Sequence, residues 1–181
     1  MTIIHKSPYD DVEILDVPIT EFVLRHADTL SEKPAFIEGA SGRIVTFGEL
    51  KDLIHRFAGG LASRGFGPGD TLALVSPNLP EYAVVFHGTA VAGGTVTTVN
   101  PTYGAEEIRF QLNDAGASIL VTIEAAVPIA LEAIEGTDVT EIIVIGNHED
   151  ATPLSEVISS EPIDQVSVDL SSQAMVLPYS S

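Results

Sequence analysis

Several residue types that carry enzyme chemistry occur in this chain, but their spacing does not assemble a metal site or a hydrolase. The five histidines form neither an HxxxH nor an HExxH arrangement and stand apart, as His5, His26, His55, His87 and His148. A metal ion needs several ligands at set spacings, so we expect packing or surface roles for them. The GxSxG pattern of a hydrolase nucleophile is absent. The chain also has no cysteine, which excludes thiolate nucleophiles and disulfides.

The glycines Gly65, Gly67 and Gly69 invite comparison with phosphate-binding loops. Such a loop follows a strand and opens a helix, so that the amino terminus of the helix faces the phosphate. Here the order is reversed, because the glycines follow an amphipathic helical pattern and precede the apolar run 71–76. We therefore interpret them as a helix end and a turn.

Charge and composition narrow the range of partners. The 181 residues include 26 Asp and Glu against 8 Lys and Arg, a net charge of -18, which disfavours nucleic acids and anionic membranes. The weakly charged stretch 81–106 is interrupted by Gly93, Gly94 and Pro101, so we do not expect a transmembrane span. The amino terminus shows no signal-peptide pattern, and we expect a cytoplasmic protein.

The stretch 81–112 is the one around which the rest of the chain is organised. It predicts an apolar helix over 80–92, a Gly-Gly turn and a buried strand over 95–99. We assign the following segment Asn100-Pro101-Thr102-Tyr103 to turn geometry and packing. A second helix opens near Gly104, with Glu106 and Glu107 in its first turn, where the helix dipole favours carboxylates.

The remaining segments complete an alternating pattern of strands and helices. We expect a surface arm over 1–17 with at most one short strand, a helix over 19–30 capped by Thr20, a hairpin over 35–46 and a helix over 124–135. Thr46 and Glu49 form a capping box for a long helix, whose apolar face comprises Leu50, Leu53, Ile54, Phe57, Ala58, Leu61 and Ala62. Further strands are expected at 71–76, 118–122, 141–145 and 173–178. This order predicts an α/β fold with a doubly wound, mainly parallel sheet and helices on both faces.

Four segments, in order, resemble the N-terminal region of the adenylate-forming (AMP-binding) ligases. They are TFGEL at 46–50, PNLPEY at 77–82, VAGGTVTTVNPTYGAEEIRFQLNDAGASILVT at 91–122 and AMVLPYSS at 174–181. The similarity is to the branch that holds coumarate:CoA ligases, fatty acyl-CoA synthetases and beetle luciferase. It implies that residues 1–181 are an N-terminal subdomain, with the rest of the large domain and the C-terminal lid lying beyond them.

The resemblance also implies a site and a reaction. In that family a strand ending in Tyr-Ser-Ser runs into a loop, GTTG-x-PKG, that wraps the phosphates of ATP. Ser180 and Ser181 would then begin this loop, and no other residue is assigned to catalysis or to a metal. The parent protein would use ATP, Mg2+ and coenzyme A to convert a carboxylic acid into its acyl-CoA through an acyl-adenylate, releasing pyrophosphate and AMP. We expect the 181 residues alone to be inactive.

A second hypothesis is a self-contained, noncatalytic α/β module that binds a small molecule or a partner in a strand-end crevice. The apolar strand that reaches the last residues of the chain argues against it. For the fragment, a sheet edge left uncovered should expose apolar surface, so we expect self-association. The sequence leaves fatty, coumaric and luciferin-like acids as open substrates.

Overall fold

A single parallel sheet forms the centre of the computed structural model, which describes residues 7–10 and 12–179. Its six strands have the order β7-β6-β5-β3-β4-β8, and each neighbouring pair is parallel. They are β3 (Thr71–Val75), β4 (Thr95–Val99), β5 (Ala117–Ile123), β6 (Glu141–Ile145), β7 (Thr152–Pro153) and β8 (Val176–Pro178). An antiparallel hairpin of β1 (Pro34–Ile37) and β2 (Ile44–Thr46) stands apart from this sheet. The predicted parallel sheet is confirmed.

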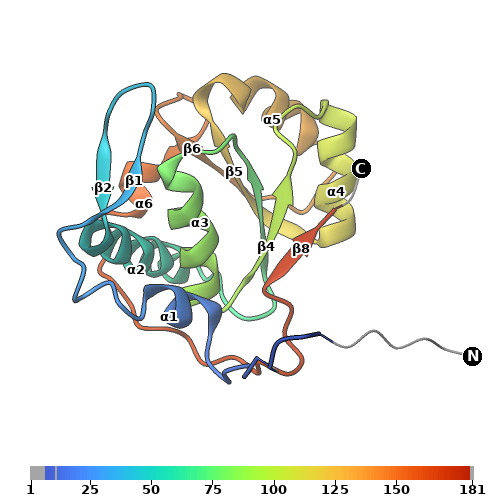
Figure 1. Cartoon of the computed structure of the whole chain (residues 1–181). Helices are drawn as coiled ribbons and strands as arrows, with labels where there is room; N and C mark the ends of the chain where they lie inside the picture. Colours follow the sequence, from blue (N-terminus) through green and yellow to red (C-terminus); the bar gives the residue numbers. More distant parts are fainter. Residues whose placement is uncertain (1–6, 11, 180–181) are drawn as a thin grey trace, which may run out of the picture.

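Helices cover both faces of the sheet (Figure 1). They are α1 (Ile19–Leu24), α2 (Phe47–Ser63), α3 (Pro80–Val91), α4 (Ala105–Ala115), α5 (Val127–Ala133) and α6 (Leu154–Val157), with a 3-10 turn η1 (Glu124–Ala126). One core contains buried residues of α2, α3 and α6, and a second core contains those of α4 and α5. The predicted doubly wound α/β fold is therefore confirmed.

Helix α2 begins where the sequence predicts. The side chain of Thr46 accepts a hydrogen bond from the amide of Glu49 at 3.2 Å, and the amide of Thr46 donates to Glu49 Oε2 at 2.8 Å. These two bonds satisfy amides that have no partner inside the helix. The predicted capping box is confirmed, and it directs Ile54, Phe57 and Leu61 into the core with no exposed surface.

The buried face of α2 differs in part from the prediction. Ala62 is exposed, whereas Gly59 and Gly60 are buried. A side chain on Gly59 would overlap the carbonyl oxygen of Glu161, and one on Gly60 would overlap that of Val157. The helix is thus covered on one side by α3 and the sheet and on another by α6 and the chain after it, which hydrophobic periodicity alone does not indicate.

The first helix is shorter than predicted and has another start. The prediction was 19–30 with Thr20 as its cap, but α1 ends at Leu24 and Pro18 is its N-cap. Thr20 is instead 2% exposed, and its hydroxyl lies 3.0 Å from Nδ1 of His87 on α3. The hydroxyl of Thr20, which the local sequence predicts as a helix cap, is therefore bonded to a distant helix instead.

Two other predicted elements change in extent. The helix predicted over 124–135 begins as η1, and α5 starts only at Val127, which leaves Pro128 in the first turn where it is tolerated. The strand predicted over 173–178 is limited to β8, three residues long. No strand forms in the described part of the arm, residues 7–10 and 12–17, while residues 1–6 and 11 lie outside the described chain.

The chain crosses the molecule between β7 and β8. The strand β7 was not predicted, because it is only two residues long and contains Pro153; it pairs with β6 at the sheet edge opposite β8. Residues 158–175, which we call the strap, then return to the β8 edge. The strap amides of Ile163 and Val166 donate to the carbonyls of His55 on α2 and Val91 on α3. Among the described residues no helix has the length and apolarity needed to cross a membrane.

Candidate functional site

The carboxyl ends of the central strands define the place where a ligand site is expected. In an open parallel sheet, ligands bind where adjacent strands send their connections to opposite faces. Here β3 is followed by α3 on one face and β4 by α4 on the other. β8 is the neighbour of β4, and Tyr179 directly follows it. Tyr179 therefore lies beside the switch point of the sheet.

Side chains of β4 reinforce the short pairing with β8. Val96, Thr97 and Thr98 are paired with Val176, Leu177 and Pro178. The hydroxyl of Thr95 donates to the carbonyl of Ala174 at 2.7 Å, and that of Thr97 donates to the carbonyl of Leu177 at 3.0 Å. The edge strand is thus attached by side-chain bonds as well as by its backbone.

The buried side-chain amide of Gln111 on α4 is bonded to the same strand, β4. Gln111 is 2% exposed, and its Nε2 donates to Thr97 Oγ1 at 2.8 Å and to the carbonyl of Thr98 at 3.0 Å. A buried amide without such partners would be costly, so its position is well defined. Sequence analysis missed Gln111, and the only available signal was a polar residue at a buried position of the helical pattern.

Tyr179 closes one side of a hollow at the end of β8. Its hydroxyl donates to the carboxylate of Asp114 at 2.5 Å, and this bond, with a smaller effect of burial, raises the pKa of Tyr179 to about 12. The phenol therefore stays neutral at physiological pH. The hollow has a volume of about 350 Å³ and is lined by Tyr103, Glu106, Glu107, Phe110, Gln111 and Tyr179.

The turn after β4 is stabilised by its own side chains. Asn100 Oδ1 accepts from the amide of Thr102 at 3.0 Å and from its hydroxyl at 2.9 Å. The amide of Gly104 donates to Glu107 Oε2 at 2.7 Å; because Gly104 has no side chain, this is the single side-chain bond of that helix start. The assignment of 100–103 to turn geometry is confirmed.

The charge around the hollow is negative. Its lining includes Glu106 and Glu107 but no Lys or Arg, and Asp114 is bonded to Tyr179 at its side. The lining therefore offers carboxylate and phenol groups, and none of its described side chains carries a positive charge that would attract phosphate.

Comparison with known proteins relates this architecture to a family. The family described as "AMP-binding enzyme" matches residues 23–181. The chain belongs to the AMP-binding enzyme family. This membership confirms the resemblance found in the sequence segments, and it applies to nearly the whole described fold.

Proteins similar to this chain include plant CoA ligases. The chain is 30% identical to 4-coumarate–CoA ligase 3 of Oryza sativa subsp. japonica, over 99% of this chain and 32% of the relative. It is 37% identical to 4-coumarate–CoA ligase of Pinus taeda, over 68% of this chain and 23% of the relative. The chain thus spans about a third or less of the length of these relatives.

Solved structures agree on the fold. A long-chain-fatty-acid-CoA ligase from Archaeoglobus fulgidus superimposes with a TM-score of 0.87 at 22% identity, over 97% of this chain and 36% of that structure. A benzoate CoA ligase from Burkholderia xenovorans LB400 gives a TM-score of 0.79 at 22% identity, over 88% of this chain and 32% of that structure.

The two residues assigned to the phosphate loop of the AMP-binding family come directly after the described structure. The family match includes Ser180 and Ser181. Both lie outside the described residues, which end at Tyr179. Their role in the loop therefore stays a prediction, while the strand that leads to them is in place.

The glycine cluster before β3 is structural, as predicted. Gly65 and Gly69 have φ angles of 81° and 97°, which glycine adopts without strain. The amide of Gly67 donates to Asp70 Oδ2 at 2.8 Å. An amide that a phosphate could use is thus already bonded to a carboxylate of the same turn.

Three of the four described histidines, His55, His87 and His148, have side-chain hydrogen-bond partners, and His26 is exposed. His87 contacts Thr20, and burial lowers its pKa from the ordinary value. Nδ1 of His55 lies 2.7 Å from the carbonyl of Ile163 in the strap. In the part of the chain that the structure describes, no group of three or more His, Asp or Glu residues could hold a metal ion.

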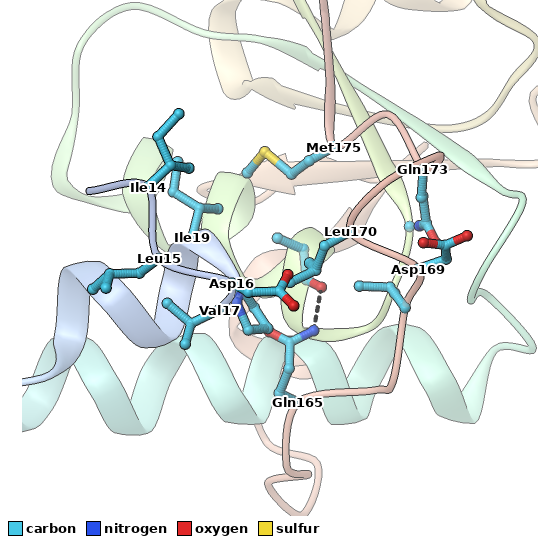
Figure 2. A pocket seen from close by; sticks show the side chains of 14 residues that line it. Ile14, Leu15, Asp16, Val17, Ile19, Gln165, Asp169, Leu170, Gln173 and Met175 are labelled. Carbon is cyan, nitrogen blue, oxygen red and sulfur yellow. Dashed lines mark hydrogen bonds between the residues drawn. The ribbon is translucent and has the colours of Figure 1, made fainter. Parts of the chain in front are cut away.

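A second hollow, of about 350 Å³, lies at the amino ends of β4 and β8, the ends opposite to Tyr179. Figure 2 shows side chains of the arm, such as Ile14, and of the strap, such as Leu170, around it. Gly94 and Met175 also line it, and they precede β4 and β8. This hollow was not predicted from the sequence. It is separated from Tyr179 by the length of β8.

Proposed function

We propose that this chain is the N-terminal third of a cytoplasmic, ATP-dependent acyl- or aryl-CoA ligase. The observation that carries the proposal is the direction of β8, which leaves the sheet beside the switch point toward Ser180 and Ser181. Membership in the AMP-binding family and similarity to CoA ligases support it. The net charge of -18 disfavours nucleic acid as a partner.

The proposed reaction has two steps. A carboxylate oxygen of the acid attacks the α-phosphorus of ATP, and the bond to pyrophosphate breaks to give the acyl-adenylate. The thiol of coenzyme A then loses its proton to solvent, its sulfur attacks the acyl carbon, and the bond to AMP breaks to give the thioester. Each step moves negative charge onto phosphate oxygens, which positive groups and backbone amides stabilise.

The described residues fit a supporting role toward ATP rather than a complete site. They hold the strand that leads to the loop, but the hollow beside Tyr179 is lined by acidic and aromatic groups. In this proposal Mg2+ and residues after Ser181 supply the charge that neutralises the phosphates. The acid and coenzyme A would be bound outside the described part of the chain.

The test compares two proteins, the 181-residue chain and a longer product of the same gene that continues past Ser181. Both are given ATP, Mg2+, coenzyme A and, in turn, a fatty acid, 4-coumarate or benzoate. We expect thioester and AMP from the longer protein with at least one acid, and none from the 181 residues. Thioester formation by the short chain would contradict its proposed inactivity, and no adenylate or thioester from the longer protein would contradict the ligase.

We also infer that the 181-residue chain self-associates. Phe110 on α4 is 66% exposed beside Tyr179, and β8 leaves one edge of the sheet without a described partner strand. Exposed apolar side chains next to an open strand edge favour association. Sedimentation should show a mass that rises with concentration and falls back in Phe110→Ser. A monomer at all concentrations would overturn the inference.

The noncatalytic binding module stays as a second candidate because of the hollow in Figure 2, whose lining is largely apolar. It predicts that the 181-residue chain itself binds a small molecule. Thermal unfolding of the 181-residue chain with the same acids distinguishes the binding module from the ligase fragment. Stabilisation by an acid that Leu170→Glu abolishes would favour the module. No stabilisation by any acid would leave the ligase as the single candidate.

A further inference from the structure

The link between α4 and the functional end of β8 is a directed chain of hydrogen bonds. Gln111 Nε2 donates to Thr97 Oγ1 at 2.8 Å, and Thr97 Oγ1 donates to the carbonyl of Leu177 at 3.0 Å. A hydroxyl has one proton, so Thr97 can accept from Gln111 because its own proton goes to Leu177. Thr97 has no exposed surface and Gln111 only 2%, so water does not compete for these bonds.

The end of β8 has few other attachments. Three residues of β8 are paired with β4, and no described strand pairs with its other edge. Val176 and Leu177 are half-buried and Pro178 is exposed. Proline donates no backbone hydrogen bond, so the last position of the strand is attached still more weakly. The bond to Leu177 is therefore the last buried side-chain attachment before the chain reaches Tyr179.

We propose that Gln111 is a positioning residue for the phosphate loop, acting through Thr97 on the carbonyl of Leu177. This rests on the proposed ligase function. Gln111 does not touch ATP in this scheme. It sets the direction in which the chain leaves the sheet, and a phosphate-binding loop works only when its amides are held close to their productive positions.

A purely structural role makes a different prediction. If Gln111 contributed only to the overall stability of the fold, its replacement would increase amide exchange equally in all strands of the sheet. In our proposal the loss is local to β8. Thr122 on β5 provides the matched control, because its hydroxyl is buried and donates to the carbonyl of Val75 at 2.9 Å without any link to β8.

The first experiment uses the 181-residue chain and amide hydrogen exchange. In Gln111→Met and Thr97→Val we expect exchange of the amides of Val176, Leu177 and Tyr179 to rise about fivefold, the equivalent of one lost hydrogen bond, with β3 amides changed less. Thr97→Ser keeps the hydroxyl and should restore the wild-type rate. Thr122→Val should leave 176–179 unchanged apart from any global effect. Equal changes at β3 and β8 in Thr97→Val would overturn the proposal.

The second experiment uses the longer protein and steady-state kinetics of adenylate formation. We expect Gln111→Met to lower kcat about tenfold, with a higher KM for ATP and an unchanged KM for the acid. Thr97→Ser should be close to wild type. If wild type shows no ATP-dependent activity, the ligase proposal fails while the exchange experiment still tests the link. If wild type is active and Gln111→Met matches it in kcat and in KM for ATP, the positioning role is wrong.

Discussion

The strands β3 and β8 belong to the same sheet but are stabilised in different ways. All five residues of β3 are buried, and the strand has a partner on each side. β8 has three residues, none of them fully buried, one described partner strand and bonds from polar side chains of β4. The centre thus depends on apolar packing, whereas the edge that leads to the proposed site depends on a few directed bonds.

The sharpest test of this difference replaces one phenylalanine in each region. Phe57 on α2 has no exposed surface, so Phe57→Ala should lower the free energy of unfolding by about 3–5 kcal/mol through lost burial and a cavity. Phe110→Ala, at a side chain 66% exposed beside β8, should change it by no more than about 0.5 kcal/mol. Urea denaturation measures both. Similar losses would remove the distinction between core and edge.

A second test concerns the tight contact that α2 makes with α6. A methyl group on Gly60 would overlap the carbonyl of Val157, so Gly60→Ala should cost about 1–3 kcal/mol despite the better helix propensity of alanine. Gly39 has open space around it, and Gly39→Ala is the control. In thermal unfolding, the midpoint of Gly60→Ala should lie below that of Gly39→Ala. A midpoint of Gly60→Ala above that of wild type would mean that α2 and α6 can move apart.

The third test compares the starts of two helices. Thr46→Ala removes half of the capping box of α2 and should cost about 1 kcal/mol. Glu107→Ala removes the side-chain bond to Gly104 at the start of α4 and should cost about 0.5 kcal/mol, the typical contribution of an exposed carboxylate near a helix amino terminus. Denaturant midpoints rank the two. A larger cost for Glu107→Ala would show that the edge helix needs its cap more than the core helix does.

The smallest expected effect is a pH dependence of the free energy of unfolding, caused by the partly buried His87. Burial lowers the pKa of His87 below 6.5, so the unfolded chain takes up this proton at higher pH than the folded chain. The stability associated with His87 is therefore complete above the unfolded-state pKa and declines as pH falls from there toward the folded-state pKa. His87→Gln should lose this part of the decline, which begins in wild type as the pH falls below about 7.5.

Thr20→Val is the control for that experiment. It removes the hydroxyl that contacts Nδ1 but keeps the imidazole, so the decline with falling pH should persist. If wild type and His87→Gln lose stability in parallel over this range, another group is responsible for the decline.

Features that depend on near neighbours in sequence were predictable. The capping box of Thr46 and Glu49 and the buried strand at 95–99 are in place, because each is specified by a few adjacent residues. Features that depend on distant segments were not. Thr20 is bonded to His87, and Gly60 faces Val157, for reasons visible only when the helices are packed together.

The candidate site divides in the same way. Its place at the carboxyl end of the last strand follows from the strand order and from the resemblance to AMP-binding ligases. The support of that strand by Gln111 was missed, because the sequence places Gln111 14 residues after Thr97 and 66 before Leu177 with no repeating pattern to relate them. Hydrophobic periodicity identifies apolar partners well and gives little information on buried polar ones.

The strand order also has a consequence for protein synthesis. β8 is the last of the six strands to be translated and is joined to the rest by the strap, yet it completes an edge next to β4, an early strand. Chains emerge from the ribosome amino terminus first, at about 5–20 residues per second. The other five strands can therefore pair before β8 arrives. Until then, the edge of β4 is open to neighbouring nascent chains, which makes this interval the one in which a chaperone would matter most.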